Sequence, residues 1–368
     1  MKITCSRQEL QEAVTNVQRA VSSKSSLPAL EGILLKTKDN QIELCGYDLE
    51  LGITTVIPAN IEEAGQIVLS ARLFGDIVRR LPDDVVSISA DEKLMTNIKS
   101  GLSDFSIVAI PASEYPELPA VTGAVGVKLP EGVLRSMIRQ TLFAVADTDS
   151  KPIHTGTLFD ARDGVLKLVS VDGYRLAMRT ERTDCEEELH FVVPGKTLSE
   201  VLKLLSEEDK EVNLSVGRRH IIFQIDNYSL VSRLLEGEFL DYNAAIPAAY
   251  TTEVTAQTRS FIDSVERVSL LITDRLKSPV RCIFEDGEVK ISCATSIGKA
   301  SDEFTAAIEG DSVEIGFNNR YLLDALRNTD GDEVKIQLNG ALSPMKVLPK
   351  EGDSFLFLVL PVRLKNEG

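Results

Sequence analysis

The sequence predicts an α+β fold made of three similar domains, each with two helices packed on antiparallel sheets. Two observations carry this prediction: charged motifs recur every 124 residues, and hairpin turns recur between alternating apolar runs. Self-similarity at a fixed spacing indicates copies of one structural unit, and the 368-residue chain has room for three. We place the domains at residues 1–122, 123–250 and 251–368, because Gly, Ala, Pro and Thr collect near the two boundaries.

The clearest repeat is a base, an acid and a second base in register. It occupies residues 72–79, 196–203 and 320–327, so each copy begins 124 residues after the one before. Two bases seven residues apart lie on one face of a helix, because seven residues make nearly two turns. The acids of the three copies (Asp76, Glu200 and Asp324) lie near that face and temper its charge.

Each unit is expected to open with a helix, continue into strands, carry a second helix and end in further strands. Apolar residues at helical spacing predict opening helices at residues 6–21, 130–146 and 257–272. The second helices are predicted at 73–81, 198–205 and 321–326. Hairpin turns are predicted at Asp39-Asn40, Asp163-Gly164 and Asp286-Gly287, because such pairs between alternating runs favour tight turns. Helices and antiparallel strands in each unit give the α+β class.

The charge balance argues against nucleic-acid binding when it is taken as a whole. Lys and Arg number 40 and Asp and Glu 56, a formal net charge of −16, whereas phosphate affinity comes from clustered Lys and Arg. The charge is unevenly spread, however: the six helix windows together carry +5 and the remainder −21. Threefold repetition of the bases favours one basic surface for phosphate backbones over three unrelated solvated faces.

No motif for catalysis accompanies the repeat. Gly195-Lys196-Thr197 lacks the first glycine of a phosphate loop, and the three histidines lack metal-ligand spacing. His154 and Asp172 are the one imaginable acid–base pair, and a structural role for both is favoured over a hydrolase. We therefore expect a protein that is not an enzyme and that holds neither cofactor nor metal.

The cysteines and the chain start bear on the compartment. Cys5, Cys45, Cys185, Cys282 and Cys293 are scattered and form no C-x-x-C motif, so we expect five buried small side chains without disulfides. The first twelve residues have no apolar core of a secretory signal, and no apolar run approaches ~20 residues. A cytoplasmic protein is expected.

Several segments resemble one family along the whole chain. They are Ser26–Leu30, Glu114–Pro119, Val171–Leu176 and the closing Leu360–Leu364. With the threefold repeat, they are similar to the bacterial DNA polymerase III beta subunits, the replicative DNA sliding clamps. This resemblance implies a ring-shaped homodimer of the DNA clamp fold with its helices around the hole. It implies double-stranded DNA bound without sequence preference, and as partners the replicative DNA polymerase, the clamp loader and other proteins with a clamp-binding motif.

The repeat and the resemblance together give three groups of site residues. The DNA-binding candidates are Lys24, Arg72, Arg79, Arg135, Arg139, Thr148, Lys196, Lys203, Arg267, Arg320 and Arg327. The resemblance implies a partner-peptide groove at His154, Gly173, Tyr174, Arg175, Leu176, Ala245, Asn318, Tyr321, Pro344, Met345, Val359, Leu360, Pro361, Val362 and Arg363. It also implies a dimer interface that places Phe105 and Ile107 against Leu270 and Leu271.

Two questions stay open at this point. The chain departs from the more familiar groove occupants at His154, Ala244 and Ala245, and Lys365–Gly368 extend past the usual end. The preferred partner motif and the role of that extension therefore do not follow from the sequence. A different class of protein is the alternative: a non-catalytic scaffold or receptor of three repeats that does not bind DNA.

Overall fold

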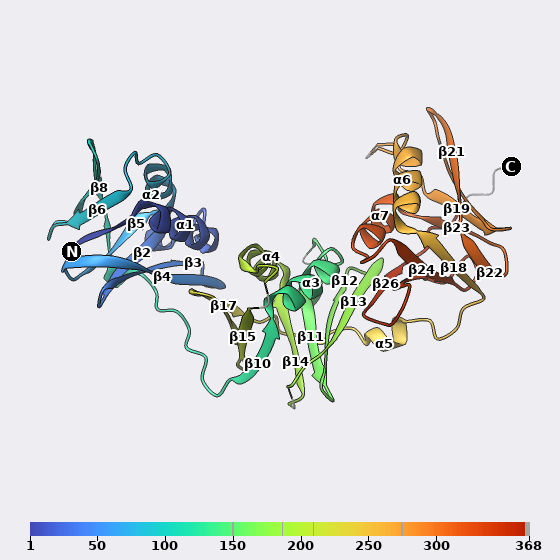
Figure 1. The fold of residues 1–368 in the computed structure, drawn as a ribbon, viewed down its shortest axis with the longest axis horizontal. Coiled ribbons are helices and arrows are strands. Elements are labelled where there is room, and N and C mark those ends of the chain that lie inside the picture. Colours follow the sequence, from blue (N-terminus) through green and yellow to red (C-terminus); the bar gives the residue numbers. More distant parts are fainter. Residues whose placement is uncertain (149–150, 186, 209, 274, 365–368) are drawn as a thin grey trace. The chain divides into compact units, whose positions relative to one another are not determined.

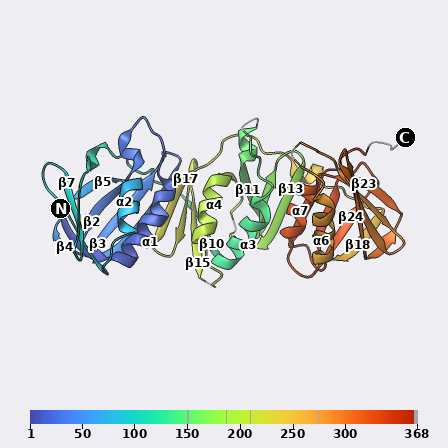
Figure 2. The same cartoon turned by 90° about the horizontal axis from the view of Figure 1, so that it is seen from above.

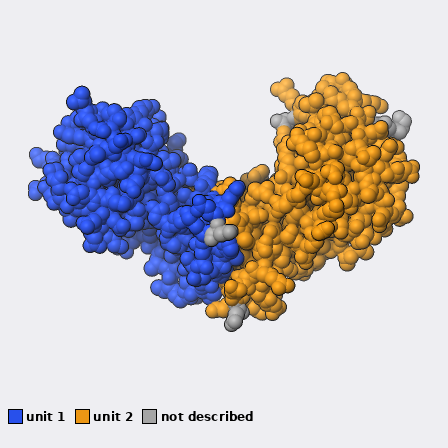
Figure 3. Space-filling view, viewed as in Figure 1, with its two compact units in different colours: residues 1–131, 203–234 blue, residues 132–202, 235–368 orange. Residues whose placement is uncertain are grey.

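The computed structural model describes residues 1–148, 151–185, 187–208, 210–273 and 275–364 (Figure 1). The Lys365–Gly368 extension lies outside the described residues. The contacts within the chain divide it into two compact units (Figure 3). Unit 1 comprises residues 1–131 and 203–234, and unit 2 comprises residues 132–202 and 235–368.

Unit 1 is organised around antiparallel strands. The longest path of paired strands runs β10-β15-β16-β17-β4-β1-β6-β7-β8, and β3, β2, β5 and β9 continue from β4 in that order. The strands are β1 (Lys2–Ser6), β2 (Gly32–Lys38), β3 (Gln41–Tyr47), β4 (Leu51–Glu63), β5 (Gln66–Ser70), β6 (Val85–Ala90), β7 (Met95–Ser100), β8 (Ser103–Val108), β9 (Ile110–Pro111), β10 (Val125–Pro130), β15 (Glu211–Val216), β16 (His220–Ile225) and β17 (Tyr228–Arg233). Helices α1 (Arg7–Val17) and α2 (Ala71–Val78) pack against each other and on strands of this system.

Unit 2 contains two antiparallel sheets. One has the order β14-β11-β12-β13-β26-β25-β24-β18-β22 and the other the order β21-β20-β19-β23. The strands are β11 (Gly156–Arg162), β12 (Val165–Val171), β13 (Arg175–Arg182), β14 (Leu189–Pro194), β18 (Thr252–Gln257), β19 (Val280–Glu285), β20 (Glu288–Thr295), β21 (Gly298–Thr305), β22 (Ala307–Gly310), β23 (Val313–Phe317), β24 (Glu333–Leu338), β25 (Met345–Pro349) and β26 (Phe355–Val359). The helices are α3 (Glu131–Leu142), α4 (Gly195–Leu204), α5 (Tyr242–Ala245), α6 (Thr258–Ser269) and α7 (Asn319–Arg327), of which α3 and α4 reach into unit 1 at one end.

The helices form because their apolar residues follow the helical repeat. In α6 the buried residues Phe261, Val265 and Val268 lie on one face, and α6 packs against α7 (Figures 1 and 2). The side chain of Asn318 caps α7 by accepting hydrogen bonds from the backbone N–H groups of Arg320 and Tyr321. All six expected helices are present with ends that differ by a few residues: α1, α2, α3 and α6 are shorter than expected and α4 and α7 longer. The short helix α5 was not expected.

The predicted hairpins are confirmed. Asp39, Asp163 and Asp286 have positive φ angles of 50°, 51° and 50°, at the turns that join β2 to β3, β11 to β12 and β19 to β20. Asp tolerates this left-handed region better than most residues, which is why these turns occur at these points of the sequence.

Two strand pairings join segments that the repeat assigns to different domains. In unit 1, β17 pairs with β4, so that Leu230 lies opposite Ile53. In unit 2, β13 pairs with β26, so that Leu176 lies opposite Leu358. The expected middle domain therefore contributes strands to both compact units, and its boundaries at residues 122 and 250 stay predictions.

The expectation that all five cysteines are buried is wrong for one of them. Cys5, Cys45, Cys282 and Cys293 are buried, whereas Cys185 is partly exposed. Cys185 lies in the connection after β13. Its described neighbours Asp184 and Glu187 are polar and exposed, so no apolar face encloses it. Burial raises the pKa of the thiols of Cys5 and Cys282 to about 12 and that of Cys45 to about 11.

Thiol reactivity should separate Cys185 from the others. Because thiolate is the reactive form, the high pKa of the buried thiols suppresses their reaction at pH 8 in addition to the steric shielding. We expect Ellman's reagent to titrate one thiol rapidly in the native protein and five in guanidinium chloride. Cys185→Ser should remove the rapid phase, and rapid reaction of a second thiol in that variant would contradict the burial pattern.

One further property of the helices concerns membranes. Within the described residues, none of the helices combines the length and the apolar character that crossing a bilayer requires.

Candidate DNA and partner interfaces

In unit 1 the candidate DNA-binding bases lie at α2 and in a loop. Arg72 is exposed on the first turn of α2, and Lys24 is exposed in the loop that follows α1. Arg79, just after α2, is 3.1 Å from Asp76, and Arg80 is 3.7 Å from the same carboxylate. Asp76, the acid of the repeat, therefore forms ion pairs directly with the neighbouring bases Arg79 and Arg80.

The helices α3 and α4 carry further candidates, of which Arg135 and Lys196 lie in unit 2 and Lys203 in unit 1. Arg135 of α3 donates a hydrogen bond to the backbone carbonyl oxygen of Leu202 in α4, at 3.2 Å. Lys196 lies exposed at the start of α4, and Lys203 is exposed near its end. Thr148 is exposed in the segment after α3. The bond between Arg135 and Leu202 holds the two helices together, so Arg135 has a structural role besides its charge.

Helices α6 and α7 also carry candidate bases, two of which form ion pairs with acidic side chains. Arg320 is exposed on the first turn of α7. Arg327 at the end of α7 is 2.8 Å from Glu266 of α6, and the hydrogen bond from Arg327 lowers the pKa of that carboxyl group. Arg267 of α6 donates from its Nε to Asp302, at 2.7 Å. The pairs join helix to helix and helix to sheet, and they reduce the positive charge that an approaching phosphate meets.

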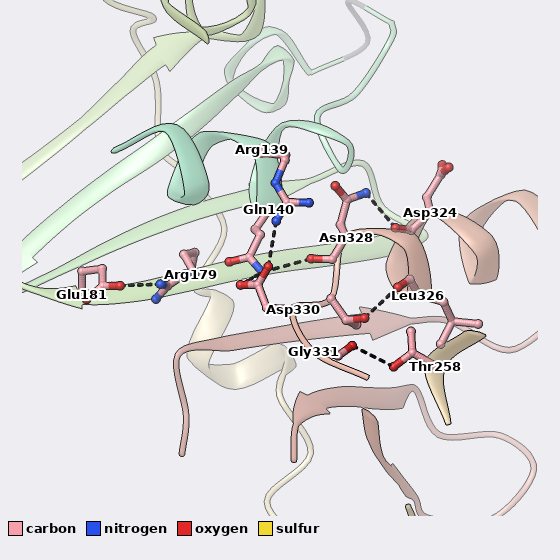
Figure 4. Close-up of polar contacts among 11 residues, drawn as sticks. Arg139, Gln140, Arg179, Glu181, Thr258, Asp324, Leu326, Asn328, Asp330 and Gly331 are labelled. Atoms are coloured by element: carbon pink, nitrogen blue, oxygen red, sulfur yellow. Dashed lines mark hydrogen bonds and ion pairs between the residues drawn. The ribbon is translucent and has the colours of Figure 1, made fainter. Parts of the chain in front are cut away.

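Arg139 takes part in a polar cluster between α3 and the segment after α7 (Figure 4). Asp330 accepts hydrogen bonds from Arg139 and from Gln140, each at 2.7 Å. The amide of Gln140, whose side chain is buried, also donates to the carbonyl oxygen of Asn328 at 3.0 Å. Sequence patterns did not predict this cluster, because its members are about 190 residues apart and carry no repeat signal.

The candidate partner groove gathers around the last strand of unit 2. Leu360 donates its backbone N–H to the carbonyl oxygen of Tyr174, at 2.9 Å, and Met345 lies opposite Val359 across β25 and β26. Tyr174 stacks on Tyr321 with ring centroids 5.9 Å apart. Tyr174, Leu360 and Val362 are 62%, 38% and 39% exposed, so this cluster offers apolar surface to a partner. The structure thus brings together four separate stretches of the chain, around Tyr174, Tyr321, Met345 and Leu360.

The surroundings of the cluster follow from a few further residues. Gly173, with φ at +90°, shapes the turn before Tyr174. Pro344 precedes β25 and is partly buried, and Pro361 is partly buried between Leu360 and Val362. Asn318, already described as the cap of α7, fixes the first turn on which Tyr321 lies.

Arg175 has a different environment from the one expected of a groove residue. Its guanidinium group forms ion pairs with Asp172, at 2.8 Å, and with Asp324. It also lies over the ring of Tyr321, 4.5 Å from the centroid, and near the ring of Phe143. With its side chain only 10% exposed, Arg175 joins β13 to α7 rather than facing a partner. Leu176, the next residue, is buried in the apolar core below.

The short helix α5 packs through Tyr242 in the same apolar core as Leu176. Asp241 caps α5, and the hydroxyl group of Tyr242 donates a 2.7 Å hydrogen bond to the carboxylate of Asp160. Burial alone would raise the pKa of Asp160, but hydrogen bonds from Tyr242 and His190 and the charge of Arg162 lower it overall. This anchor holds the helix that presents Ala245, which is exposed. The sequence signal for it was the Asp before Tyr242, a capping residue that our prediction overlooked.

His154 and Asp172 occupy separate structural roles. The ring of His154 packs edge-on against Phe239, with centroids 5.5 Å apart. Burial, and to a smaller extent the charge of Lys151, lowers the pKa of His154. Asp172 accepts hydrogen bonds from the backbone N–H groups of Tyr174 and Arg175 and pairs with the Arg175 side chain. The hydrolase hypothesis has no geometric support in these contacts.

The candidate dimer residues lie at two edge strands. Among the described residues β8 pairs with β7 alone, and it carries Phe105 and Ile107, both partly buried. In the part of the chain that the structure describes, β21 pairs with β20 alone, at an edge of the smaller sheet, and Leu271 packs on the core beside it. Leu270, at the end of α6, is 80% exposed. Unpaired strand edges with exposed apolar side chains are surfaces that another chain can cover.

Comparison with known proteins agrees with this geometry. Sequence models of the DNA polymerase III beta subunit match along the chain: the N-terminal domain at residues 1–119, the central domain at 128–241 and the C-terminal domain at 243–363. A beta sliding clamp of Bacillus subtilis is 33% identical over 376 residues, covering 99% of this chain and 100% of the relative. A beta sliding clamp of Staphylococcus aureus strain Mu50 is 32% identical over 374 residues, covering 99% of each chain.

Solved structures give the same result. The DNA polymerase sliding clamp from Bacillus subtilis matches with a TM-score of 0.96 and 32% identity, covering 99% of this chain and 100% of that one. The DNA polymerase III beta subunit from Pseudomonas aeruginosa matches with a TM-score of 0.94 and 28% identity over 99% and 100%. Repeated α+β units with a helix pair each, on sheets shared between domains, define the clamp class of folds.

The chain belongs to the DNA polymerase III beta subunit family. The resemblance, the fold class and the expected function in DNA replication as a sliding clamp are thereby confirmed.

Proposed function

We propose that two copies of this chain close into a ring around duplex DNA and hold the replicative polymerase on it. One observation carries the proposal: Arg72, Lys196 and Arg320 are exposed at equivalent positions of three helices in a chain whose net charge is −16. A few exposed bases at a regular spacing suit contact with phosphates and carry no means of reading bases.

Ring closure would use the two edge strands described above. β8 of one copy would pair with β21 of the other, placing Phe105 and Ile107 against Leu270 and Leu271. Because the two surfaces differ, each subunit supplies one of each, and a two-fold axis closes the dimer with two equal interfaces.

The candidate partner groove would receive short peptide segments of partner proteins. Its exposed apolar residues, Tyr174, Leu360 and Val362, surround polar backbone groups, and such surfaces accept short apolar motifs. The replicative polymerase, the clamp loader and other proteins with a clamp-binding motif would share this site. The protein would act as a topological tether, without a catalytic step of its own.

Retention on circular DNA tests the ring directly. After loading by a clamp loader onto nicked circular DNA, the protein should comigrate with the circle in gel filtration. When a restriction enzyme linearises the circle, the protein should no longer comigrate with the DNA. A protein that binds DNA by contact alone would leave circles and linear molecules at the same rate. Equal rates would favour the alternative of a scaffold without a DNA-encircling role.

Removing the three repeated bases should weaken the DNA contact without opening the ring. For Arg72→Ala/Lys196→Ala/Arg320→Ala we expect a lower affinity for short duplexes and a salt slope reduced by up to about 3, since each lost phosphate contact removes roughly 0.9. The control variant Lys335→Ala/Lys350→Ala/Lys290→Ala removes the same charge from strands and loops of the C-terminal region. If both triple variants bind DNA alike, the helix bases have no special role.

A further inference from the structure

A concave basic surface lies beside the candidate partner groove, shares Val362 and Arg363 with it, and shares Lys299–Ser301 with β21, the edge strand of the proposed dimer contact. It is a cavity of about 870 Å³ in unit 2, between the segment before β19, the β20–β21 turn and residues 362–364. We call it the basic pocket, and the five bases that line it are Arg275, Lys277, Arg281, Lys299 and Arg363.

The charge of the basic pocket is opposite to that of the domain around it. Residues 243–363 contain 13 Lys and Arg and 18 Asp and Glu, a net charge of −5. Five of those bases line the basic pocket, whereas its lining includes no Asp or Glu among the described residues. The segregation resembles that of the helices, but it occurs at a separate place, between a sheet and residues 362–364.

Several of these bases have charge available for a ligand. Arg281 pairs with Glu314 at 2.8 Å, so its charge is partly used. Arg275, Lys277 and Arg363 are exposed and form no ion pair with any residue that the structure describes. Their mutual repulsion is not offset within the described chain, and an anionic ligand would relieve it.

The basic pocket continues directly from the candidate partner groove. Leu360 is hydrogen-bonded to Tyr174 in the groove, while Val362 donates its N–H to Gly316 and lines the basic pocket. Leu360 and Val362 are two residues apart, roughly 7 Å of extended chain, and Val362 contributes to both surfaces. A peptide bound in the groove would bring its flanking residues to the basic pocket.

We propose that the basic pocket binds an acidic segment that flanks the docking motif of a partner protein. The proposal rests on the partner-docking function proposed above and gives that site a charge preference. Side-chain carboxylates fit the combination of bases, the hydroxyl groups of Ser292, Thr295 and Ser301, and the apolar side chains of Leu276 and Val362. The volume lies within the range of small-ligand sites, which suits a few peptide side chains and excludes a double helix.

The test compares peptides that differ only in charge. The probes are fluorescent peptides with an apolar tetrapeptide next to six Glu, in either order, and the same peptides with six Gln. Against the full-length dimer, we expect the Glu peptide of one order to bind roughly three- to tenfold more tightly than its Gln counterpart, as for a few exposed charge pairs. The preference should vanish at 1 M salt, where the Debye length is ~3 Å.

Substitutions then locate the effect. Arg275→Ser/Lys277→Ser should bring the Glu peptide to within twofold of the Gln peptide and leave Gln peptide binding unchanged. The matched control, Lys335→Ser/Lys350→Ser, removes the same charge outside the basic pocket and should retain the preference. Equal binding of Glu and Gln peptides by the unmodified protein, or a preference that survives Arg275→Ser/Lys277→Ser, would overturn the proposal.

Other occupants would give different results. If the Arg275→Ser/Lys277→Ser variant lost affinity for a 30-base-pair duplex, or dimerised more weakly in sedimentation, while the peptide preference stayed, the occupant would be DNA or a second copy and the proposal would be wrong. Failure of the groove itself is separable. In that case Tyr174→Ala would not weaken the Gln peptide, whereas the ratio of Glu to Gln binding would still decide on the basic pocket.

Discussion

Leu270→Asp should convert the protein from a dimer into a monomer of 40.3 kDa. Leu270 is 80% exposed in the single chain, so the substitution costs the fold little. In the proposed ring the same side chain is covered in both interfaces. Losing that burial costs roughly 1.5–3 kcal/mol per interface, and two interfaces double the effect to about 3–6 kcal/mol. The buried, unpaired carboxylate adds to this cost.

Sedimentation equilibrium measures this result directly. We expect the dimer dissociation constant to rise at least a hundredfold, and the variant to be lost from circular DNA. Leu342→Asp is the matched control, because Leu342 is 75% exposed in the same domain and lies away from both proposed edge strands. A Leu270→Asp protein that remains a dimer at nanomolar concentration would contradict the proposed interface.

Arg175→Ala should destabilise unit 2 more than any other substitution of a base discussed above. The change removes ion pairs to Asp172 and Asp324 and the contact with the ring of Tyr321. Asp172 would be left with its side chain only 11% exposed and without its cation. Breaking a buried pair by removing one partner costs about 3–5 kcal/mol. We take about 3 kcal/mol here, because Asp324 is 37% exposed and regains water.

Thermal unfolding separates this role from direct partner contact. Arg175→Ala should lower the melting temperature by several degrees and weaken peptide binding together with it. Arg175→Lys should lie in between, since lysine keeps the charge but not the planar two-sided geometry. Arg139→Ala is the control: its pair with Asp330 is 44% and 50% exposed and should matter little. Peptide binding lost at Arg175→Ala with an unchanged melting temperature would instead make Arg175 a contact residue.

Sequence patterns predicted the parts of this molecule that repeat, and they did not predict the contacts that occur once. The helices and the turns at Asp39, Asp163 and Asp286 were predictable, because local spacing and turn chemistry determine them. The triad of base, acid and base was found by its period, and one of its acids, Asp76, proved to pair with its neighbours.

Long-range pairing was beyond the reach of those patterns. Nothing local indicates that Asp330 holds Arg139, or that Asp324 of the third copy faces Arg175 of the second. The candidate groove likewise draws on segments from residue 154 to residue 363, and only the resemblance brought them together. Ion pairs between distant elements depend on tertiary packing, which periodicity does not encode.

The pairing of β4 with β17 has a consequence for the connection between the first two family domains. The chain passes between them through residues 116–124, which form neither helix nor strand. A row of backbone hydrogen bonds across β4 and β17 fastens the same two domains independently of that loop. A protease nick in the loop would therefore leave the fragments associated through the sheet, although Leu118 of the loop also packs on the apolar core of the first domain.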